Sequence, residues 1–487
     1  MAGSARYPKV DPNDLFLRGI AIQLIEAVDQ RYGPESTFEQ MCDYRFELAR
    51  GFLWLAEELD LQRRVTNAKE VEVDGQRYRQ LDQPSSATYN GCWGPHLIKE
   101  SLYRQIGQHN GPTIKPIELR TGMVEGMLPD FARMVGQMSA EQTSRQLVGT
   151  LEAVRMVAPS RACLEKRAKA MAAEVSAQVE ELEEAARTEP ISEPVGAISC
   201  GMDRGAVRMV EPLDPAAAPP RERLEPYQRT PPPPSELHYR MAWNGSVTLY
   251  DLVGRPLHTF RYAAEASADP QELARRISAD VVWVQRQYPF ANVHCIQDGA
   301  PELRVLPETL ERDLPPNVTI NNIELVDFEH LMGYLKDVVD ACEPSGDPRG
   351  LKTWYRNALL SDDGAIDRIW RKLRDLSKSL PRSASKSLSR SARKKRKAVA
   401  AALSYIRKRK DRMRYATRYA RRLPISSGDT ENTVWLMQQR VKRAGQSWQT
   451  RGLGGILALR ALVLSGRWGA AWTSYASKFH EEVRIAA

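Results

Sequence analysis

The sequence predicts a mixed α/β core that is interrupted by a large all-helical insertion and preceded by a mostly helical α+β region. Three observations lead to this prediction. Strand-like segments cluster between residues 195 and 326, where two helical segments separate them. The residues after Phe328 show helical spacing and many Arg and Lys side chains. The chain's 487 residues also exceed what one hydrophobic core usually serves, so several domains are expected.

The N-terminal α+β region is expected to span residues 1–138. Apolar residues recur at helical spacing between residues 13 and 62, which predicts two or three helices. Between residues 70 and 105 the pattern alternates, and Asp74-Gly75 is a tight-turn signal just after Val71 and Val73. A hairpin is therefore expected there.

Residues 139–190 are expected to form a helix-turn-helix-like DNA-binding segment. Two helical patterns flank a break at Ala158-Pro159-Ser160, where Ser160 can cap the second helix. In that helix Leu164, Ala168 and Met171 are expected to face inward. The cations expected to contact phosphates are Arg161, Lys166, Arg167 and Lys169. An ordinary helical hairpin explains the same pattern equally well, so both interpretations stay open.

The core is expected to span residues 191–327. Its predicted strands are 195–202, 239–250, 256–262, 292–297 and 318–326, and its predicted helices are 270–287 and 301–311. A proline-rich segment at 212–235 is expected to be an extended loop. The order strand, strand, strand, helix, strand, helix, strand is that of an RNase H-like fold, in which the first and fourth strands lie side by side.

Residues 328–422 are expected to form the basic helical insertion, and residues 423–487 the C-terminal helices that complete the core. No further strand is expected after Phe328. The longest apolar run, 452–464, is broken by Arg460 and is too short for a bilayer, so a buried helix is expected. No apolar signal core is found near the N-terminus. We expect a soluble protein of the bacterial cytoplasm, associated with the nucleoid.

The composition favours a polyanionic partner. The net charge is +9, while the six cysteines form no CxxC pair and the seven histidines no HxxxH or HExxH unit, which argues against a zinc finger. The densest positive charge lies at Arg393, Lys394, Lys395, Arg396 and Lys397 and at Arg407, Lys408, Arg409 and Lys410. These residues are expected to bind DNA phosphates without regard to sequence, and a merely solvated charge run is the alternative.

Three tyrosines, Tyr405, Tyr415 and Tyr419, are interleaved with this charge at helical spacing. Aromatic rings in such a setting can stack on unpaired bases. We favour the alternative, that they pack against a neighbouring helix.

Three carboxylates are the candidate catalytic residues. Asp203 follows the first predicted strand and Asp298 the fourth, so parallel pairing would bring both to one sheet edge despite their separation of 298 − 203 = 95 residues. Glu431 lies where a helix is expected to begin, and that helix can press it toward the sheet. Converging carboxylates suit Mg²⁺, and two ions about 4 Å apart can assist phosphoryl transfer. Singly, each acid also fits a turn, a strand end or a helix start.

Several motifs then follow one another in a characteristic order. They are residues 112–126, Gly201-Met202-Asp203, Gln297-Asp298-Gly299, Asp327-Phe328-Glu329-His330 and residues 427–431. Together they resemble ISKra-type insertion-sequence transposases, which are related to Mutator-like transposases, and the likeness covers roughly residues 75–475. The resemblance implies that Asp203, Asp298 and Glu431 are the DDE acids and hold two Mg²⁺ ions, for which Mn²⁺ can substitute. Asp327 and His330 would support them, although for His330 we favour a structural role as a core histidine.

The resemblance also implies an activity. A DDE transposase hydrolyses a phosphodiester at each end of its element and then transfers the freed strand end into target DNA. It acts on double-stranded DNA as a homodimer or a larger assembly. Two alternatives stay open: a catalytically inactive, transposase-derived DNA-binding protein, and a structure-selective RNase H-like nuclease that cuts branched DNA without joining it.

Overall fold

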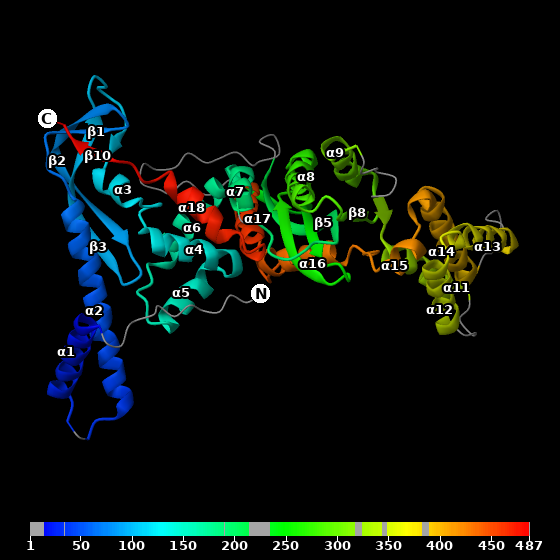
Figure 1. The fold of residues 1–487 in the computed structure, drawn as a ribbon, viewed down its shortest axis with the longest axis horizontal. Helices are drawn as coiled ribbons and strands as arrows, with labels where there is room; N and C mark the ends of the chain where they lie inside the picture. Colours follow the sequence, from blue (N-terminus) through cyan, green and yellow to red (C-terminus); the bar gives the residue numbers. More distant parts are fainter. Residues whose placement is uncertain are drawn as a thin grey trace. The chain divides into compact units, whose positions relative to one another are not determined.

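The computed structural model describes residues 14–33, 35–188, 190–213, 234–316, 324–342, 348–381 and 389–486. Within them the chain is mixed α/β and divides into two compact units. The N-terminal unit comprises Met1–Val135, Thr143–Arg167 and Ala476–Ala487, and the central unit comprises Gly136–Gln142 and Ala168–Tyr475. Each unit contains one five-stranded sheet (Figure 1).

Two long helices begin the N-terminal unit, as the helical spacing predicts. They are α1, Leu15–Arg31, and α2, Phe38–Arg64. Asp14 caps α1 through its carboxylate, and Thr37 forms a capping box at the start of α2.

The sheet of the N-terminal unit has the strand order β10-β1-β2-β3-β4. Its strands are β1 Glu70–Val73, β2 Gln76–Asn90, β3 Pro95–Gln105, β4 Thr113–Ile114 and β10 Val483–Ile485. The predicted hairpin is confirmed, because Asp74 and Gly75 turn between β1 and β2 with φ of 49° and 70°. The expectation of no strand after Phe328 was wrong, since β10 pairs with β1. A segment of three residues carries little strand signal, and Val483–Ile485 are extended because they pair with the edge strand β1.

Shorter helices follow this sheet in the chain. They are α3 Pro116–Thr121, α4 Pro129–Glu141, α5 Ser144–Ala153, α6 Arg161–Ala177 and α7 Val179–Ala185, the last followed by a 3-10 turn, Ala186–Thr188. The expected break separates α5 from α6, and Ser160 Oγ accepts the N–H of Cys163 at 3.3 Å. Leu164 and Met171 are fully buried, as predicted.

The sheet of the central unit has the strand order β7-β6-β5-β8-β9. Its strands are β5 Ala197–Pro212, β6 Ser235–Tyr250, β7 Pro256–Ala264, β8 Asn292–Gln297 and β9 Glu324–Val326. Pairing is antiparallel among β5, β6 and β7 and parallel among β5, β8 and β9. The helix α8, Pro270–Gln287, has the predicted bounds. The helix expected at 301–311 is a 3-10 turn, Pro301–Arg304, followed by α9, Val305–Asp313.

β5 is longer than predicted. We expected a strand ending at Met202 with Asp203 behind it, but β6 pairs with β5 from Ala197 to Pro212 and keeps it extended. Asp203 therefore lies inside β5. The proline-rich loop expected at 212–235 lies largely outside the described residues, and its first and last residues, Pro212 and Ser235, belong to strands. The first residues of the strand expected at 318–326 are likewise outside the described residues.

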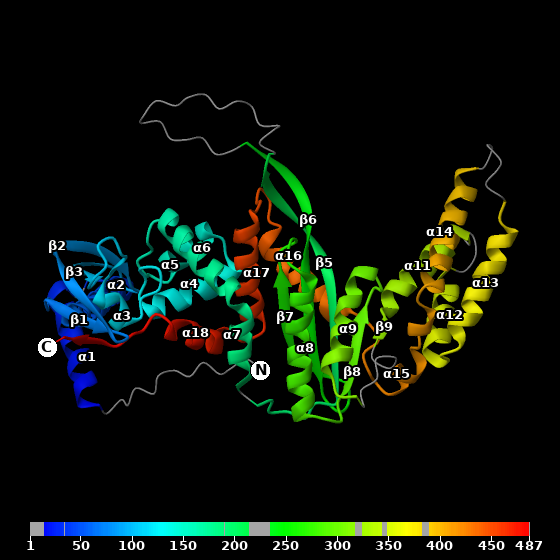
Figure 2. The same cartoon turned by 90° about the horizontal axis from the view of Figure 1, so that it is seen from above.

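Helices cover both faces of the central sheet (Figure 2). On one face Ile198, Cys200 and Met202 of β5 share a buried core with α8 and α9. The alternate residues Gly201 and Gly205 approach α16, Gly428–Val441, on the other face. Beside α16 lies α17, Thr450–Leu464, which contains the predicted buried apolar run and packs against β7. Among the described residues, no helix has the length and apolar character needed to cross a bilayer.

A helical segment separates β9 from α16, as predicted for residues 328–422. Its elements are α11 Phe328–Cys342, α12 Pro348–Ser361, α13 Ala365–Ser379, α14 Arg390–Arg407, a 3-10 turn Lys410–Arg412 and α15 Ala416–Ala420, and a last helix, α18 Trp468–Ser477, follows α17. The helices α11 to α14 share one buried core. Tyr405 and Tyr415 are buried as expected, whereas Tyr419 is 55% exposed.

Candidate functional site

Three aspartates lie in one row across the parallel strands of the central sheet. The parallel pairing of β5 with β8 ends at Cys200 and Cys295, and the offset of 295 − 200 = 95 residues, continued past this pair, relates Asp203 in β5 to Asp298 just after β8. The charge of Asp298 acts on Asp203, which agrees with this placement. The β8–β9 register has an offset of 326 − 297 = 29, which places Asp327 beside Asp298. Equivalent positions on parallel strands direct their side chains to one face. This is the face that α16 covers.

The first turn of α16 brings Glu431 to this row. The hydroxyls of Thr430 and Ser246 hydrogen-bond at 2.8 Å, and Tyr250 donates its hydroxyl to the Asp429 carboxylate. Ser246 and Tyr250 both belong to β6, and the Thr430 side chain is buried. The helix start is thereby held on the sheet, next to the acids.

Charge and burial act together on these carboxylates. Burial raises the pKa of Asp203 above its usual value, and the negative charge of Asp298 adds to this rise, although the backbone N–H of Arg204 donates to Asp203 Oδ1 at 2.6 Å and opposes it. Burial also raises the pKa of Glu431, and the charges of Asp327 and Asp203 contribute in the same direction. The group is therefore a crowded set of anions that a cation would stabilise.

Asp327 is the most enclosed of the four acids, with 1% of its surface exposed. Its Oδ1 accepts the N–H of Glu329 at 2.8 Å, which caps α11, and its Oδ2 accepts the hydroxyl of Ser427. Ser427 Oγ is also 3.4 Å from Glu431 Oε1. Ser427 thus links Asp327 to Glu431, a role that the sequence pattern did not indicate beyond its place before a helix.

The loop that carries Asp298 is held by the end of the helical segment. Asp298 Oδ1 accepts the N–H of Ala300 at 2.7 Å, forming a tight turn. Tyr405 donates its hydroxyl to the backbone oxygen of Asp298 at 2.8 Å, and Arg409 Nε donates to the backbone oxygen of Gly299 at 2.8 Å. Sequence reasoning could not find these two contacts, because more than a hundred residues separate the partners.

His330 does not occupy the core position that we favoured. It is exposed, because the buried positions of α11 are Phe328, Leu331 and others on the opposite side. Its ring lies 5.6 Å from that of Tyr405, and its charge would lower the pKa of Asp203. It is therefore close to the acids, as the motif resemblance implies for a supporting residue.

The cations that were predicted to bind DNA have different surroundings. On α14 and just after it, Arg393, Lys394, Lys397, Arg407, Lys408 and Lys410 are exposed, whereas Lys395, Arg396 and Arg409 are half-buried. Lys410 pairs with Asp367 at 2.9 Å. On α6, Arg161, Lys166 and Lys169 are exposed, and Arg167 donates to the backbone oxygen of Gly126 at 2.7 Å. Arg167 and Arg409 thus have structural contacts.

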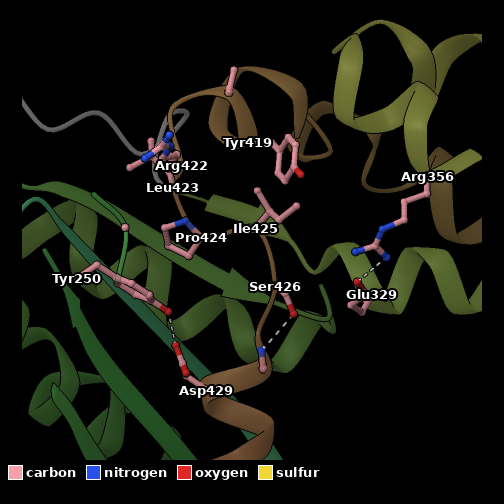
Figure 3. Close-up of a pocket in the computed structure, with 13 residues that line it drawn as sticks. Tyr250, Glu329, Arg356, Tyr419, Arg422, Leu423, Pro424, Ile425, Ser426 and Asp429 are labelled. Carbon is pink, nitrogen blue, oxygen red and sulfur yellow. Dashed lines mark hydrogen bonds and ion pairs between the residues drawn. The ribbon is translucent and has the colours of Figure 1, made fainter. Parts of the chain in front are cut away.

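A cavity of about 790 Å³ lies beside the segment that leads into α16 (Figure 3). Its wall includes Tyr250, Tyr419, Arg422 and the ion pair between Arg356 and Glu329. The apolar residues Leu423, Pro424 and Ile425 also line it. The next residues along the chain, Ser426 and Gly428, line the cavity as well and flank Ser427. The cavity therefore adjoins the acidic row.

Arg422 has an unusual backbone conformation at the edge of this cavity. Its φ is 57°, a left-handed value that favours glycine. It ends α15, because its N–H donates to Tyr419 O at 2.9 Å and the next N–H, of Leu423, donates to Arg418 O at 3.0 Å. Arg422 thus lines the cavity in a backbone conformation that costs energy for a residue other than glycine.

The acids offer the hard oxygen donors that Mg²⁺ prefers. In the described parts of the chain, no three His, Cys, Asp or Glu side chains already form a complete cation site. The carboxylates are therefore neighbours whose charges act on one another, without a preformed metal site among the described residues.

Comparison with known proteins identifies no relative: no family model matches the chain, and no curated protein is similar to it.

Proposed function

We propose that this chain is a DDE transposase of an insertion sequence with an RNase H-like core. The sheet order β7-β6-β5-β8-β9, antiparallel in the first hairpins and parallel beyond β5, is the order expected of that fold and supports the proposal. The motif resemblance to ISKra-type transposases favours the same activity. Since one fold supports many functions, the proposal depends on the site.

The single observation that carries the proposal is the acidic row with α16 above it. Asp203 lies within β5, Asp298 directly follows the neighbouring parallel strand β8, and the first turn of α16 adds Glu431, whose pKa the charge of Asp203 helps to raise. Asp298 closes a tight turn and Asp327 caps α11, but these local roles do not require acids from separate elements to gather on one sheet face. The burial of Asp203 opposes its charge, which a purely structural role would not require.

Asp203, Asp298 and Glu431 would hold two Mg²⁺ ions, for which Mn²⁺ can substitute. Bound there, the ions would stabilise the charge on the attacking and leaving oxygens of a phosphodiester. The donor chemistry fits, because burial and neighbouring carboxylates raise the pKa values of Asp203 and Glu431, so a bound cation would stabilise their ionised forms. Asp327 would position Glu431 through Ser427.

The proposed reaction has two steps at the same site. Water attacks the phosphorus at an element end, and the bond to the 3′ oxygen breaks, leaving a 3′-hydroxyl and a 5′-phosphate. That hydroxyl then attacks a phosphodiester of target DNA, a new bond to phosphorus forms, and the target's 3′ oxygen leaves and takes up a proton. Handling two ends requires at least a homodimer on DNA, and the exposed cations of α14 would hold the DNA backbone.

The test uses labelled DNA that carries the borders of the gene's element, with Mg²⁺ or Mn²⁺. The parent protein is expected to cleave and join it, and D203N, D298N and E431Q to lose more than about 100-fold of that activity while still binding DNA. E311Q, which changes an exposed acid of α9, is the matched control and is expected to be fully active. A parent that binds authentic ends without cutting them would favour the inactive derivative, and cutting of branched DNA without joining would favour the nuclease.

A further inference from the structure

The helices α1 and α2 expose an unusual amount of apolar surface. They lie side by side, yet each has only one fully buried residue among its described positions, Val28 in α1 and Leu61 in α2 (Figure 1). Their exposed large apolar side chains are Leu15, Phe16, Leu17, Ile22 and Ile25 of α1 and Phe38, Phe52, Leu53, Leu55 and Leu59 of α2. Their exposed fractions run from 37% to 84%.

Only the end of α2 is fastened to the sheet of its unit. Leu61 joins a small core with Tyr89 and Ile98, and Trp54 Nε1 donates to the backbone oxygen of Pro95 at 3.1 Å. A helix of 27 residues is about 40 Å long, and its first half, where Arg155 pairs with Asp43 and lies over Phe46, extends beyond the contacts with the sheet. Helices gain most of their stability in proteins from packing an apolar face, which this hairpin mostly leaves open.

The size of the open surface corresponds to an interface. Ten such side chains at these exposures amount to roughly 1,000 Å². Each partner of a standard interface contributes about 800 Å², so the apolar surface spread over the two helices is large enough to form one.

The charge on the two helices argues against nucleic acid as the occupant. Together α1 and α2 carry six Arg and eight Asp or Glu residues, a net charge of 6 − 8 = −2. A polyanionic strand or an anionic membrane surface would gain no attraction there. Residues 1–13 also provide few large apolar side chains that could cover the patch.

We propose that this surface binds a second copy of the chain, with α1 and α2 of each copy forming a four-helix contact. A two-fold axis lets one apolar face cover its own copy, so no other sequence is required. The proposal rests on exposure and charge, and it does not depend on the chemistry of the acidic site. Under the proposed function, the contact would supply one catalytic unit for each DNA end.

The test is sedimentation of the full chain without DNA or metal over a range of concentrations. The parent is expected to be a dimer at about 10 µM, and the double variant I22E with F52E to be a monomer, its dissociation constant raised at least about 100-fold. Phe290 is 97% exposed after α8, so F290E is the matched control and should remain dimeric. A monomeric parent, or a double variant that still dimerises, would overturn the proposal.

A second measurement covers the case in which the double variant fails to fold. Amide hydrogen exchange of residues 15–64 in the parent should slow as its concentration rises through the dissociation constant, and concentration-independent exchange would overturn the proposal. D298N should dimerise like the parent. A parent that dimerises but does not cleave element-end DNA would count against the proposed function alone. A parent that cleaves this DNA as a monomer would count against the interface alone.

Discussion

Replacing Gly201 with alanine tests whether close packing of α16 on β5 positions Glu431. A Cβ at Gly201 would lie 2.5 Å from the backbone oxygen of Ile296 and 2.6 Å from Thr430 Oγ1. The first atom belongs to β8, which pairs with β5, and the second belongs to the buried first turn of α16. Neither neighbour is the free end of a flexible side chain.

The size of the effect follows from these distances. A comfortable contact needs about 3.5 Å, so the helix or the strand has to move by about 1 Å. Overpacking of this kind lowers the free energy of unfolding by about 1–3 kcal/mol. A shift of about 1 Å at a catalytic group can lower the rate by about 100-fold. G201A should therefore be folded but less stable, and nearly inactive.

The assay combines denaturant unfolding with metal-dependent cleavage of element-end DNA. Gly333 on α11 is the matched control, since no atom lies within 4 Å of a Cβ built there. G333A is expected to gain up to about 1 kcal/mol from the better helix propensity of alanine and to keep full activity. If G201A and G333A have equal stability and activity, the packing of α16 does not position Glu431 as described.

Three further predictions concern charge and backbone conformation. D203N should raise the melting temperature of the metal-free protein at pH 7, because the raised pKa of Asp203 means that its ionised form lowers the stability of the folded state. This gain should vanish below the unfolded-state pKa of about 3.9. Melting curves over a pH series that show no such trend would contradict the prediction. R422G suits the φ of 57°, so the free energy of unfolding should rise by about 1 kcal/mol. Because the change also removes a positive charge, DNA binding should weaken and its salt dependence should become shallower. A variant that is less stable in chemical denaturation would refute the strain argument. R467A leaves the fully buried Asp280 without its main partner and should lower the free energy of unfolding by about 3–5 kcal/mol in the same assay. R484A removes an exposed ion pair and should leave stability almost unchanged, and equal losses in the two variants would contradict the difference in burial.

Local signals predicted many elements of the fold. The apolar spacing and capping of residues 270–287 predict α8 with its observed bounds, and Asp74-Gly75 predicts the first hairpin. The order of strands and helices in the central unit also agrees with the prediction. Helical periodicity, capping and tight turns depend on neighbours within a few residues, and so the sequence alone carries them.

The candidate site was predicted only in part. Asp203, Asp298 and Glu431 were chosen from strand and motif order with Asp327 as a supporting residue, and the structure adds that Asp327 directly follows β9 and is linked to Glu431 through Ser427. The sequence carried no signal for the contact of Tyr405 with the Asp298 loop, because it joins distant segments.

Only the tertiary structure decided the remaining features. β5 runs through Asp203 because β6 pairs with it, β10 is a strand because β1 offers an edge, and His330 is exposed because of the side on which α11 packs. By itself, the sequence determined which segments form helices and strands and which acids could act together. How far a strand extends, which register it takes and which face a side chain occupies depend on pairing and packing between distant parts of the chain, and these exist only once the chain has folded.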